Sequence, residues 1–430
     1  MSIQSIMIFM EYFEIHGGKR LSGAIEVGGL KNAATPILAA TLLTTEPCVI
    51  SNMPRIEDVF RMLEIMESLG AKVEWIGKRT VRVQTKQLDS RCTDEKIMKK
   101  MRSSILLLGP LAARTDKFKV PYPGGCTIGA RPLDTHFDAL EKLGVQVKQT
   151  DCHFEVDARK RHAAKVVLKE FSVTGTENAL MLAAALPGKT TIKIAAAEPH
   201  VQDLARFLVK MGAKISGIGM HTLVVEGRKK LRGAKHTVIP DFNEAATFLI
   251  MGVVTKSPIV VQNAIEDHLD LVLQKLREFG ADFKIKKNSI QVIPTEKLRA
   301  VTKVDARTYP GIPTDVQAPF GVLATQAKGK TLIHDSLYEG RFNYIEEISK
   351  MGAQADIINV HQAVIEGPTK LSGQEITSFD LRAGASLIIA ALVAKGKTIV
   401  HDAYQVDRGY EKIEERLQKL GARIKRVTSN

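Results

Sequence analysis

The segment MESLGAKVEW, residues 66–75, joins the end of a predicted helix to the start of a predicted strand. Hydrophobic residues recur at helical spacing over 56–69, and they alternate over 73–83 on either side of a turn at Gly77. Glycine is the residue that best tolerates the left-handed conformation closing a helix, which suits Gly70. The segment therefore predicts a helix that ends at this glycine and is followed by a β-hairpin.

Versions of this junction return along the chain at intervals of roughly 70 residues. The further copies are EKLGVQVKQ at 141–149, VKMGAKISG at 209–217, REFGADFKI at 277–285, SKMGAQADI at 349–357 and QKLGARIKR at 418–426. A unit of this size buries little surface alone, so neighbouring units must share cores. We expect six strand–helix–hairpin repeats grouped as an α/β protein of two domains, three repeats each, with the functional site in the cleft between them.

The composition of the 430 residues, 44% of them hydrophobic, is that of a folded enzyme. The apolar stretches are shorter than the roughly 20 residues that span a bilayer, so no membrane association is expected. Residues 1–9 lack the basic start and cleavage site of a signal peptide and are interpreted as an N-terminal extension. Four scattered cysteines without metal-ligand or disulfide spacing favour a cytoplasmic location and give no metal site.

A net charge of +14 calls for an anionic partner or a solvated basic surface. Nucleic acid is disfavoured, because the Lys and Arg residues are dispersed and form no basic run interleaved with aromatic residues. A small, multiply charged substrate fits better. A cleft with positive walls would concentrate it without any linear basic track.

Two arginines occupy equivalent positions in different repeats. Arg131 lies 13 residues before Gly144, and Arg408 lies 13 residues before Gly421. Both are expected where a strand passes into a helix, beside the free amides of a helix N-terminus. Arg341 lies close to the same position in its own repeat. Any one of them could be an ordinary solvated residue, but together they predict an anion clamp.

The loop PYPGGCTIGARP, residues 121–132, surrounds one thiol with glycines and prolines and excludes a helix. Cys126 is therefore expected to be exposed. A nearby Arg131 would lower its pKa and favour proton transfer or nucleophilic attack. The alternative is an inert buried cysteine.

Two further segments place polar residues at predicted helix starts. In GGLKNAATPILAATLL, residues 28–43, Lys31 follows a glycine pair and begins an apolar helix, an arrangement that suits an anion without being a Walker A loop. In YPGIPTDVQAPF, residues 309–320, Asp315 comes just before a helical run. It could accept a proton from a substrate or simply cap the helix.

These segments resemble the UDP-N-acetylglucosamine enolpyruvyl transferase family over nearly everything from residue 10 to the C-terminus. The resemblance rests on six motifs in the family's order and spacing: GGLKNAATPILAATLL, MRSSILLLGPLAAR, PGGCTIGARPLDTH, YPGIPTDVQAPF, EGRFNYIEEISKMGA and VDRGYEKIEERL. It implies an inside-out α/β barrel of two domains, each of three βαβαββ units. One domain would span 31–239, and the second would combine 10–30 with 240–430.

The activity implied by the resemblance is transfer of the enolpyruvyl group of phosphoenolpyruvate to the 3'-hydroxyl of UDP-N-acetylglucosamine, with release of phosphate. The reaction would pass through a tetrahedral ketal in the first committed step of peptidoglycan synthesis. It requires neither a metal nor an organic cofactor. A monomer is compatible with it, and the oligomeric state stays open.

The resemblance also implies roles for individual residues. Cys126 would be the general acid and the target of fosfomycin, Asp315 the base near the 3'-hydroxyl, and Lys31 and Arg408 would take part in catalysis. Phosphoenolpyruvate would be held by Lys31, Arg102, Arg131 and Arg408. Further residues would bind the UDP-sugar or hold other site residues in place: Asn32, Pro132, Leu133, Asp134, His136, Ser172, Val173, Thr174, Thr314, Leu337, Arg341 and Arg382.

The chain departs from the family pattern in a few places, chiefly in SVTGTEN, residues 172–178, where the family usually has SVGATEN. Thr174 thus stands where a glycine normally lets backbone amides approach the diphosphate. Two alternatives remain open. One is 5-enolpyruvylshikimate-3-phosphate synthase, which lacks the cysteine loop, and the other is a non-catalytic UDP-sugar-binding paralogue, which would need no proton donor.

Overall fold

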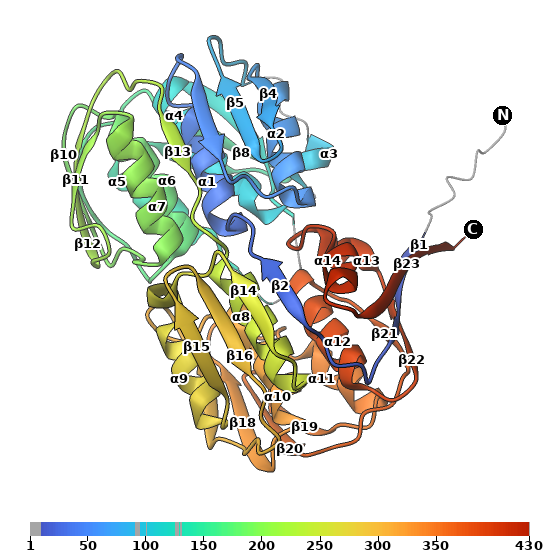
Figure 1. The fold of residues 1–430 in the computed structure, drawn as a ribbon. Coiled ribbons are helices and arrows are strands. Elements are labelled where there is room, and N and C mark those ends of the chain that lie inside the picture. Colours follow the sequence, from blue (N-terminus) through green and yellow to red (C-terminus); the bar gives the residue numbers. More distant parts are fainter. Residues whose placement is uncertain (1–9, 91–94, 100, 125–128, 130, 430) are drawn as a thin grey trace, which may run out of the picture. The chain divides into compact units, whose positions relative to one another are not determined.

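The structure, a computed structural model, describes residues 10–90, 95–99, 101–124, 129 and 131–429. The described residues divide into two units (Figure 1). Unit 1 takes its residues from Met1–Val27, Thr127–Ala130 and Phe242–Asn430, and unit 2 takes its residues from Gly28–Cys126 and Arg131–Asp241. Each is an α/β assembly of helices and mixed sheets.

Unit 2 contains three sheets within its described residues. In spatial order they are β13 (Lys235–Thr237), β3 (Cys48–Ser51), β5 (Thr80–Gln84) and β4 (Lys72–Gly77); β11 (Lys214–Ser216), β12 (Thr222–Gly227), β10 (Gly188–Lys193) and β9 (Lys165–Val167); and β6 (Lys117–Pro121), β8 (His153–Asp157) and β7 (Gln146–Gln149). Its helices are α1 (Lys31–Thr41), α2 (Glu57–Ser68), α3 (Glu95–Met98), the 3-10 helix η1 (Arg102–Leu107), α4 (Leu108–Arg114), α5 (Asp134–Lys142), α6 (Val173–Ala185) and α7 (Pro199–Lys210).

Unit 1 also contains three sheets within its described residues. They are β21 (Glu375–Thr377), β22 (Lys397–His401), β1 (Met10–His16) and β23 (Arg423–Ser429); β15 (Asp282–Lys286), β16 (Ser289–Ile293), β14 (Ile259–Gln262) and β2 (Gly23–Glu26); and β17 (Lys303–Ala306), β18 (Gly329–Asp335), β20 (Gln362–Gly367) and β19 (Gln354–Asn359). Its helices are α8 (Phe242–Val254), η2 (Glu266–His268), α9 (Asp270–Glu278), α10 (Thr314–Ala324), α11 (Asn343–Lys350), α12 (Leu381–Val393), α13 (Ala403–Asp407) and α14 (Ile413–Lys419).

The four-stranded sheets share one arrangement, a parallel pair at one edge followed by two antiparallel neighbours. In four of them the antiparallel neighbours are the two strands of one hairpin, such as β4 and β5. The fifth sheet differs, and the hairpin predicted for the sixth repeat is wrong. The strand after Gly421, β23, pairs with β1, which comes from the N-terminal part of the chain and lies between β22 and β23. Tyr12 of β1 lies opposite both His401 and Val427. The N-terminal strand therefore completes the last sheet.

The repeated helix–glycine–strand junction is confirmed in all six copies. The first copy has α2, then Gly70, then the β4–β5 hairpin. All six junction glycines have positive φ angles, between +78° at Gly144 and +112° at Gly212. Side chains with a Cβ atom rarely adopt this conformation, which explains why the sequence repeats glycine there.

The interior of unit 1 is made by α8, α10 and α12, which pack against one another (Figure 1). Every residue of α8 is buried, and α12 is buried throughout except at its last residue. Unit 2 has similar buried helices in α1 and α6. A helix that is apolar on all sides must be enclosed on all sides. The strands instead alternate between buried and exposed residues, as in β5 and β18, so each sheet has an outer face.

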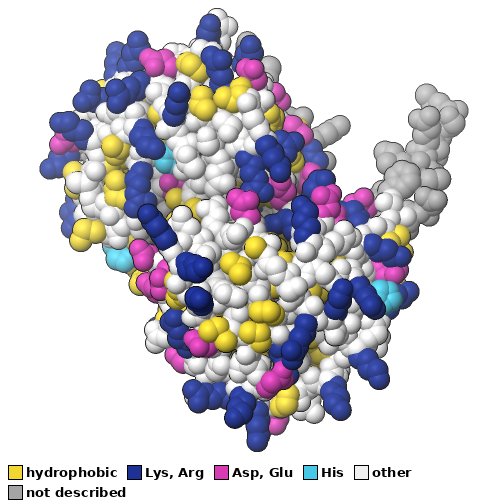
Figure 2. All heavy atoms as spheres, in the orientation of Figure 1, with side chains coloured by type: hydrophobic (Ala, Val, Ile, Leu, Met, Phe, Trp, Pro, Cys, Tyr) yellow, Lys and Arg dark blue, Asp and Glu magenta, His cyan; other side chains and the backbone are white. Residues whose placement is uncertain are grey.

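Basic side chains are spread over the surface. On the face drawn in Figure 2, Lys and Arg residues occur on many separate elements and form no continuous track. Within the part of the chain that the structure describes, no helix is long and apolar enough to cross a membrane.

The junction glycines give a matched test of backbone strain. A methyl group added at Gly212 meets nothing within 4 Å, whereas one added at Gly144 would lie 2.1 Å from the carbonyl oxygen of Lys160. We expect Gly212→Ala to lower the free energy of unfolding by about 1–2 kcal/mol, from the positive φ alone. Gly144→Ala should cost clearly more, because the backbone must also shift. Chemical denaturation of both variants checks this, and equal losses would contradict it.

Candidate active site

Several polar residues of the candidate site lie in the first turns of buried helices. Lys31 and Asn32 begin α1, Thr174 lies in the first turn of α6, and Thr314 and Asp315 begin α10. The first amides of a helix have no intrahelical acceptor, and the helix dipole makes this end positive. The starts of otherwise apolar helices are thus where this fold can place groups that bind anions.

Asp315 is the second residue of α10, and its carboxylate accepts hydrogen bonds from two arginines of unit 1. Arg341 Nη2 donates to Oδ1 at 2.8 Å, and Arg382 Nε donates to Oδ2 at 3.2 Å. The sequence analysis expected Asp315 just before the helix. This position is corrected, because Asp315 is the second residue of α10 and the cap residue is Pro313.

Arg382 is fixed from several directions in the interior. Its Nη1 donates to the hydroxyl of Tyr410 at 3.1 Å, and that hydroxyl lies 3.0 Å from Thr247 Oγ1 on α8. Its backbone N–H donates at 2.8 Å to Asp380, which caps α12. The guanidinium side chain is only 3% exposed. It therefore presents its Nε to Asp315 from a rigid position.

Arg341 is buried between two carboxylates. Its Nη1 lies 3.9 Å from Asp380 Oδ1, and its backbone carbonyl accepts from Gln317 at 3.1 Å. Burial acts to lower the pKa of Arg341, but the charges of Asp315 and Asp380 outweigh burial and raise the pKa. The guanidinium accordingly remains charged beside Asp315.

Asp335, which the sequence analysis did not single out, links two predicted site residues. The hydroxyl of Thr314 donates to its Oδ2, and the backbone N–H of Leu337 donates to its Oδ1 at 2.9 Å. Asp335 is completely buried at the end of β18. Only its position at the end of a strand hinted at this role.

Arg408 is the C-terminal cap of the short helix α13, and its Nη1 donates to Gln405 Oε1 at 3.2 Å. The prediction of a direct strand-to-helix passage is wrong here, because α13 intervenes between β22 and α14. The preceding residue, Asp407, accepts from Arg426 Nη1 and Nη2 at 2.8 and 2.6 Å. Arg426, which the sequence analysis missed, thus anchors the turn that carries Arg408.

In unit 2, Lys31 and Arg102 lie on different elements and have different partners. Lys31 Nζ lies 2.6 Å from Asp58 Oδ2, and both side chains are largely buried. Arg102 begins η1, and its Nη2 donates to the backbone carbonyl of Arg131. Arg131 itself lies between β6 and α5, where the sequence predicted a strand-to-helix passage. The structure therefore brings Arg102 and Arg131 together.

The starts of α5 and α6 meet through a buried histidine. His136 Nε2 lies 3.0 Å from Thr174 Oγ1, and its Nδ1 lies 3.1 Å from Asn178 Nδ2. Burial, with a smaller effect of the Arg102 charge, lowers the pKa of His136 to about 3. Ser172 caps α6 by accepting from the N–H of Gly175 at 3.2 Å. The helix α5 follows Pro132: Leu133 is its cap residue, and Asp134 is its first residue. Val173 is the first residue of α6.

Cys126 lies outside the described residues. Of the cysteines that the structure describes, Cys48 is buried, which raises the pKa of its thiol to about 11, and Cys152 is exposed. The described residues hold no cluster of three potential metal ligands.

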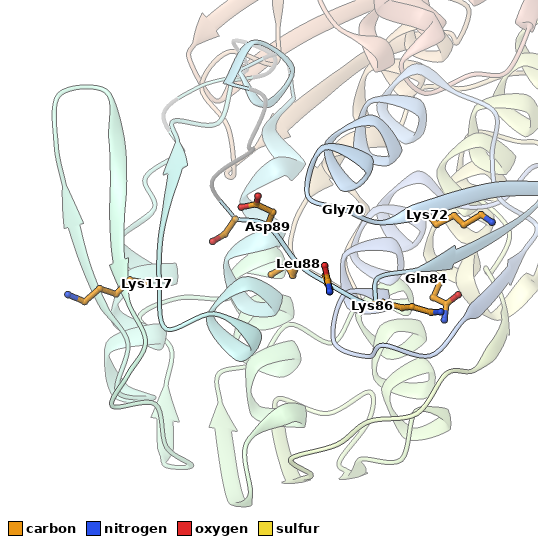
Figure 3. Close-up of a pocket in the computed structure, with 9 residues that line it drawn as sticks. Gly70, Lys72, Gln84, Lys86, Leu88, Asp89 and Lys117 are labelled. Atoms are coloured by element: carbon orange, nitrogen blue, oxygen red, sulfur yellow. The ribbon is translucent and has the colours of Figure 1, made fainter.

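A surface hollow of about 1010 Å³ lies elsewhere on unit 2 (Figure 3). It is lined by Gly70, Lys72, Gln84, Lys86, Gln87, Leu88, Asp89, Ser90 and Lys117. None of these was predicted as a site residue, and the three lysines are exposed. The lining therefore shares no residue with the predicted site.

Comparisons with known proteins agree on one family. Residues 15–417 match the family described as "EPSP synthase (3-phosphoshikimate 1-carboxyvinyltransferase)". The UDP-N-acetylglucosamine 1-carboxyvinyltransferases of Koribacter versatilis and Methylacidiphilum infernorum are 43% and 44% identical to the chain; the alignments cover 97% and 98% of it, and 97% and 100% of the relatives.

Solved structures show the same fold. The enolpyruvyl transferase NikO from Streptomyces tendae aligns with a TM-score of 0.89 at 26% identity, covering 98% of this chain and 100% of that one. An EPSP synthase from Acinetobacter baumannii aligns with a TM-score of 0.75 at 17% identity, covering 97% and 100% of the two chains.

The buried His136 predicts a pH dependence of stability. In the unfolded chain, His136 has a pKa near 6.5. Between pH 6.5 and 3, His136 is therefore protonated in the unfolded chain but neutral in the folded chain. Stability should fall as the pH drops from 6.5 toward 3, by about 2 kcal/mol at pH 5 for this residue. Chemical denaturation of the wild type and of His136→Gln at pH 7 and pH 5 measures this. The variant should lose the part of the pH dependence of stability that comes from His136. An unchanged dependence in the variant would refute it.

Proposed function

The chain belongs to the EPSP synthase family, and we propose that it is a UDP-N-acetylglucosamine 1-carboxyvinyltransferase. It transfers the enolpyruvyl group of phosphoenolpyruvate to the 3'-hydroxyl of UDP-N-acetylglucosamine and releases phosphate. One observation carries the assignment, namely 43–44% identity to enzymes of that name over nearly the whole of both chains. The product would enter peptidoglycan synthesis, and the enzyme would work in the cytoplasm.

The choice within the family rests on the degree of similarity. The aligned EPSP synthase structures are only 17–18% identical to this chain and support the fold alone. The cysteine loop at 121–132, which 5-enolpyruvylshikimate-3-phosphate synthase lacks, also favours the UDP-sugar as acceptor. A non-catalytic paralogue is disfavoured, since it would need neither this thiol nor the Asp315 arrangement.

The reaction requires cationic side chains that bind phosphoenolpyruvate while its geometry and charge distribution change. The 3'-hydroxyl adds to C2 of phosphoenolpyruvate while C3 gains a proton. The tetrahedral ketal then loses a proton from C3 as its bond to phosphate breaks, which restores the C2=C3 double bond in the product. Lys31, Arg102, Arg131 and Arg408 would bind the phosphate and carboxylate, for which the planar guanidinium fork is well suited. The same groups would stabilise the charge that develops on the departing phosphate.

Asp315 would accept the proton of the 3'-hydroxyl. The hydrogen bonds that it accepts from Arg341 and Arg382 fix both carboxylate oxygens, and a carboxylate oxygen can accept more than one hydrogen bond. The side chain is 19% exposed, so it can reach a ligand while the arginines stay buried. This geometry suits a base whose orientation must not change during the reaction.

Cys126 would deliver the proton to C3 and would be alkylated by fosfomycin. This role rests on the resemblance of PGGCTIGARPLDTH to the family motif. The remaining roles follow in the same way: Asn32 would contact the amino sugar, Pro132, Leu133, Asp134 and His136 the uridine side, and Ser172, Val173 and Thr174 the diphosphate. We also propose that the sheets of each unit represent three βαβαββ repeats of an inside-out barrel, with the domain limits 31–239 and 10–30 plus 240–430.

A phosphate-release assay tests the function directly. Release should require both phosphoenolpyruvate and UDP-N-acetylglucosamine, because the proton donor, the base and the anion clamp act on one addition reaction. Each substrate is omitted in turn as a control. Equal or faster release with shikimate 3-phosphate would overturn the assignment in favour of the alternative acceptor.

Substitution of Asp315 tests the proposed base. Asp315→Asn keeps the shape but removes proton acceptance, so kcat should fall roughly 10²–10⁴-fold while the UDP-sugar still binds. Asp356→Asn, an exposed position on β19, serves as the matched control. If Asp315→Asn retained full turnover in rapid-quench kinetics, Asp315 would not be the base.

A further inference from the structure

The side-chain amide of Asn178 has only one possible orientation. Its Oδ1 faces the backbone N–H of Gly109 at 2.8 Å, and its Nδ2 faces the carbonyl oxygen of Ile105 at 3.0 Å. A backbone N–H only donates and a carbonyl only accepts, so the oxygen and nitrogen of the amide cannot be exchanged. Asn178 is 1% exposed, so no water competes for these bonds.

The orientation of Asn178 determines the tautomer of His136. The second hydrogen of Nδ2 is directed at His136 Nδ1, 3.1 Å away, which must therefore be the unprotonated acceptor nitrogen. A neutral imidazole then carries its hydrogen on Nε2. The ring is 3% exposed, and burial keeps it neutral at physiological pH.

The tautomer in turn determines the role of Thr174. Nε2–H of His136 donates to Thr174 Oγ1 at 3.0 Å, so this hydroxyl is the acceptor in that bond. Its own hydrogen must point to another acceptor, and no acceptor for it is recorded among the described residues. Thr174 is half-buried in the first turn of α6, a helix of 13 residues. As the second residue of α6, Thr174 lies among the first residues of the helix, whose amides have no intrahelical acceptor.

We infer that Asn178 and His136 are positioning residues that hold the Thr174 hydroxyl as a hydrogen-bond donor toward the diphosphate of the UDP-sugar. The inference rests on the proposed function. It gives the threonine at this position a use that a glycine cannot have, since the side chain adds a donor to those of the helix start. A charged acceptor also makes such a hydrogen bond stronger than a neutral one.

The tautomer can be measured on the unaltered protein. Nuclear magnetic resonance of 15N-histidine-labelled wild-type chain, with the His136 signal assigned by its loss in His136→Gln, should show the Nε2–H form at every pH from 8 to 5. A hydrogen on Nδ1, or a titration near pH 6.5, would overturn the inference. This measurement does not depend on any variant of Asn178 folding.

Calorimetry tests the donor itself. Thr174→Val keeps the shape of the side chain but removes the hydroxyl, so affinity for UDP-N-acetylglucosamine should fall roughly 10- to 100-fold, as expected for losing a hydrogen bond to a charged group. Affinity for uridine, which has no diphosphate, should not change. Thr174→Ser should recover most of the loss, and Thr222→Val, at an exposed position on β12, is the matched control.

The outcomes separate the two proposals. Equal affinities of wild type and Thr174→Val for the UDP-sugar would overturn the inference alone. A parallel loss of uridine binding would also overturn it, because the effect would then be structural. A wild-type chain that binds no UDP-N-acetylglucosamine would overturn the proposed function, and the inference with it.

Discussion

The enclosure of apolar helices inside each unit is the constraint on which the rest of the structure depends. The helices α8, α10 and α12 pack against one another, and nearly all of their residues are buried. An unpaired charge in such surroundings is strongly unfavourable. Functional polar groups are therefore confined to the first turns, where the helix dipole and free amides favour anions. Lys31, Thr174 and Asp315, three of the predicted site residues, lie in such first turns.

Charges that do enter the interior are paired and held by several bonds. Asp315 lies between two arginines, and Arg382 is fixed in turn by Tyr410 and by the start of α12. Burying one of these charges alone would cost several kcal/mol, whereas pairing and hydrogen bonds offset part of that cost and fix the geometry. The rigidity that a base and an anion clamp need thus follows from the way the interior tolerates charge.

The same logic applies to neutral polar groups in unit 2. A series of hydrogen bonds runs from the backbone of Gly109 and Ile105 through Asn178 and His136 to Thr174. At each step, the orientation of one group determines whether the next group donates or accepts. Because Asn178 and His136 are buried, their polar atoms need hydrogen-bond partners. Thr174, the last group of this series, is half-buried at the start of α6, and it is the group that we infer donates to the ligand.

The sequence by itself determined the repeated helix–glycine–strand junctions and some of the helix starts. These are local features: Gly70 ends a helix because of its own φ angle, and Lys31 begins one beside its own glycines. The tertiary structure alone decided which groups meet. Asp315 and Arg382 are 67 residues apart, and His136 and Asn178 are 42 residues apart. The insertion of β1 beside β23 likewise joins opposite ends of the chain. Periodicity reports only contacts within a turn or a hairpin, whereas these pairings depend on how separate helices and strands pack together.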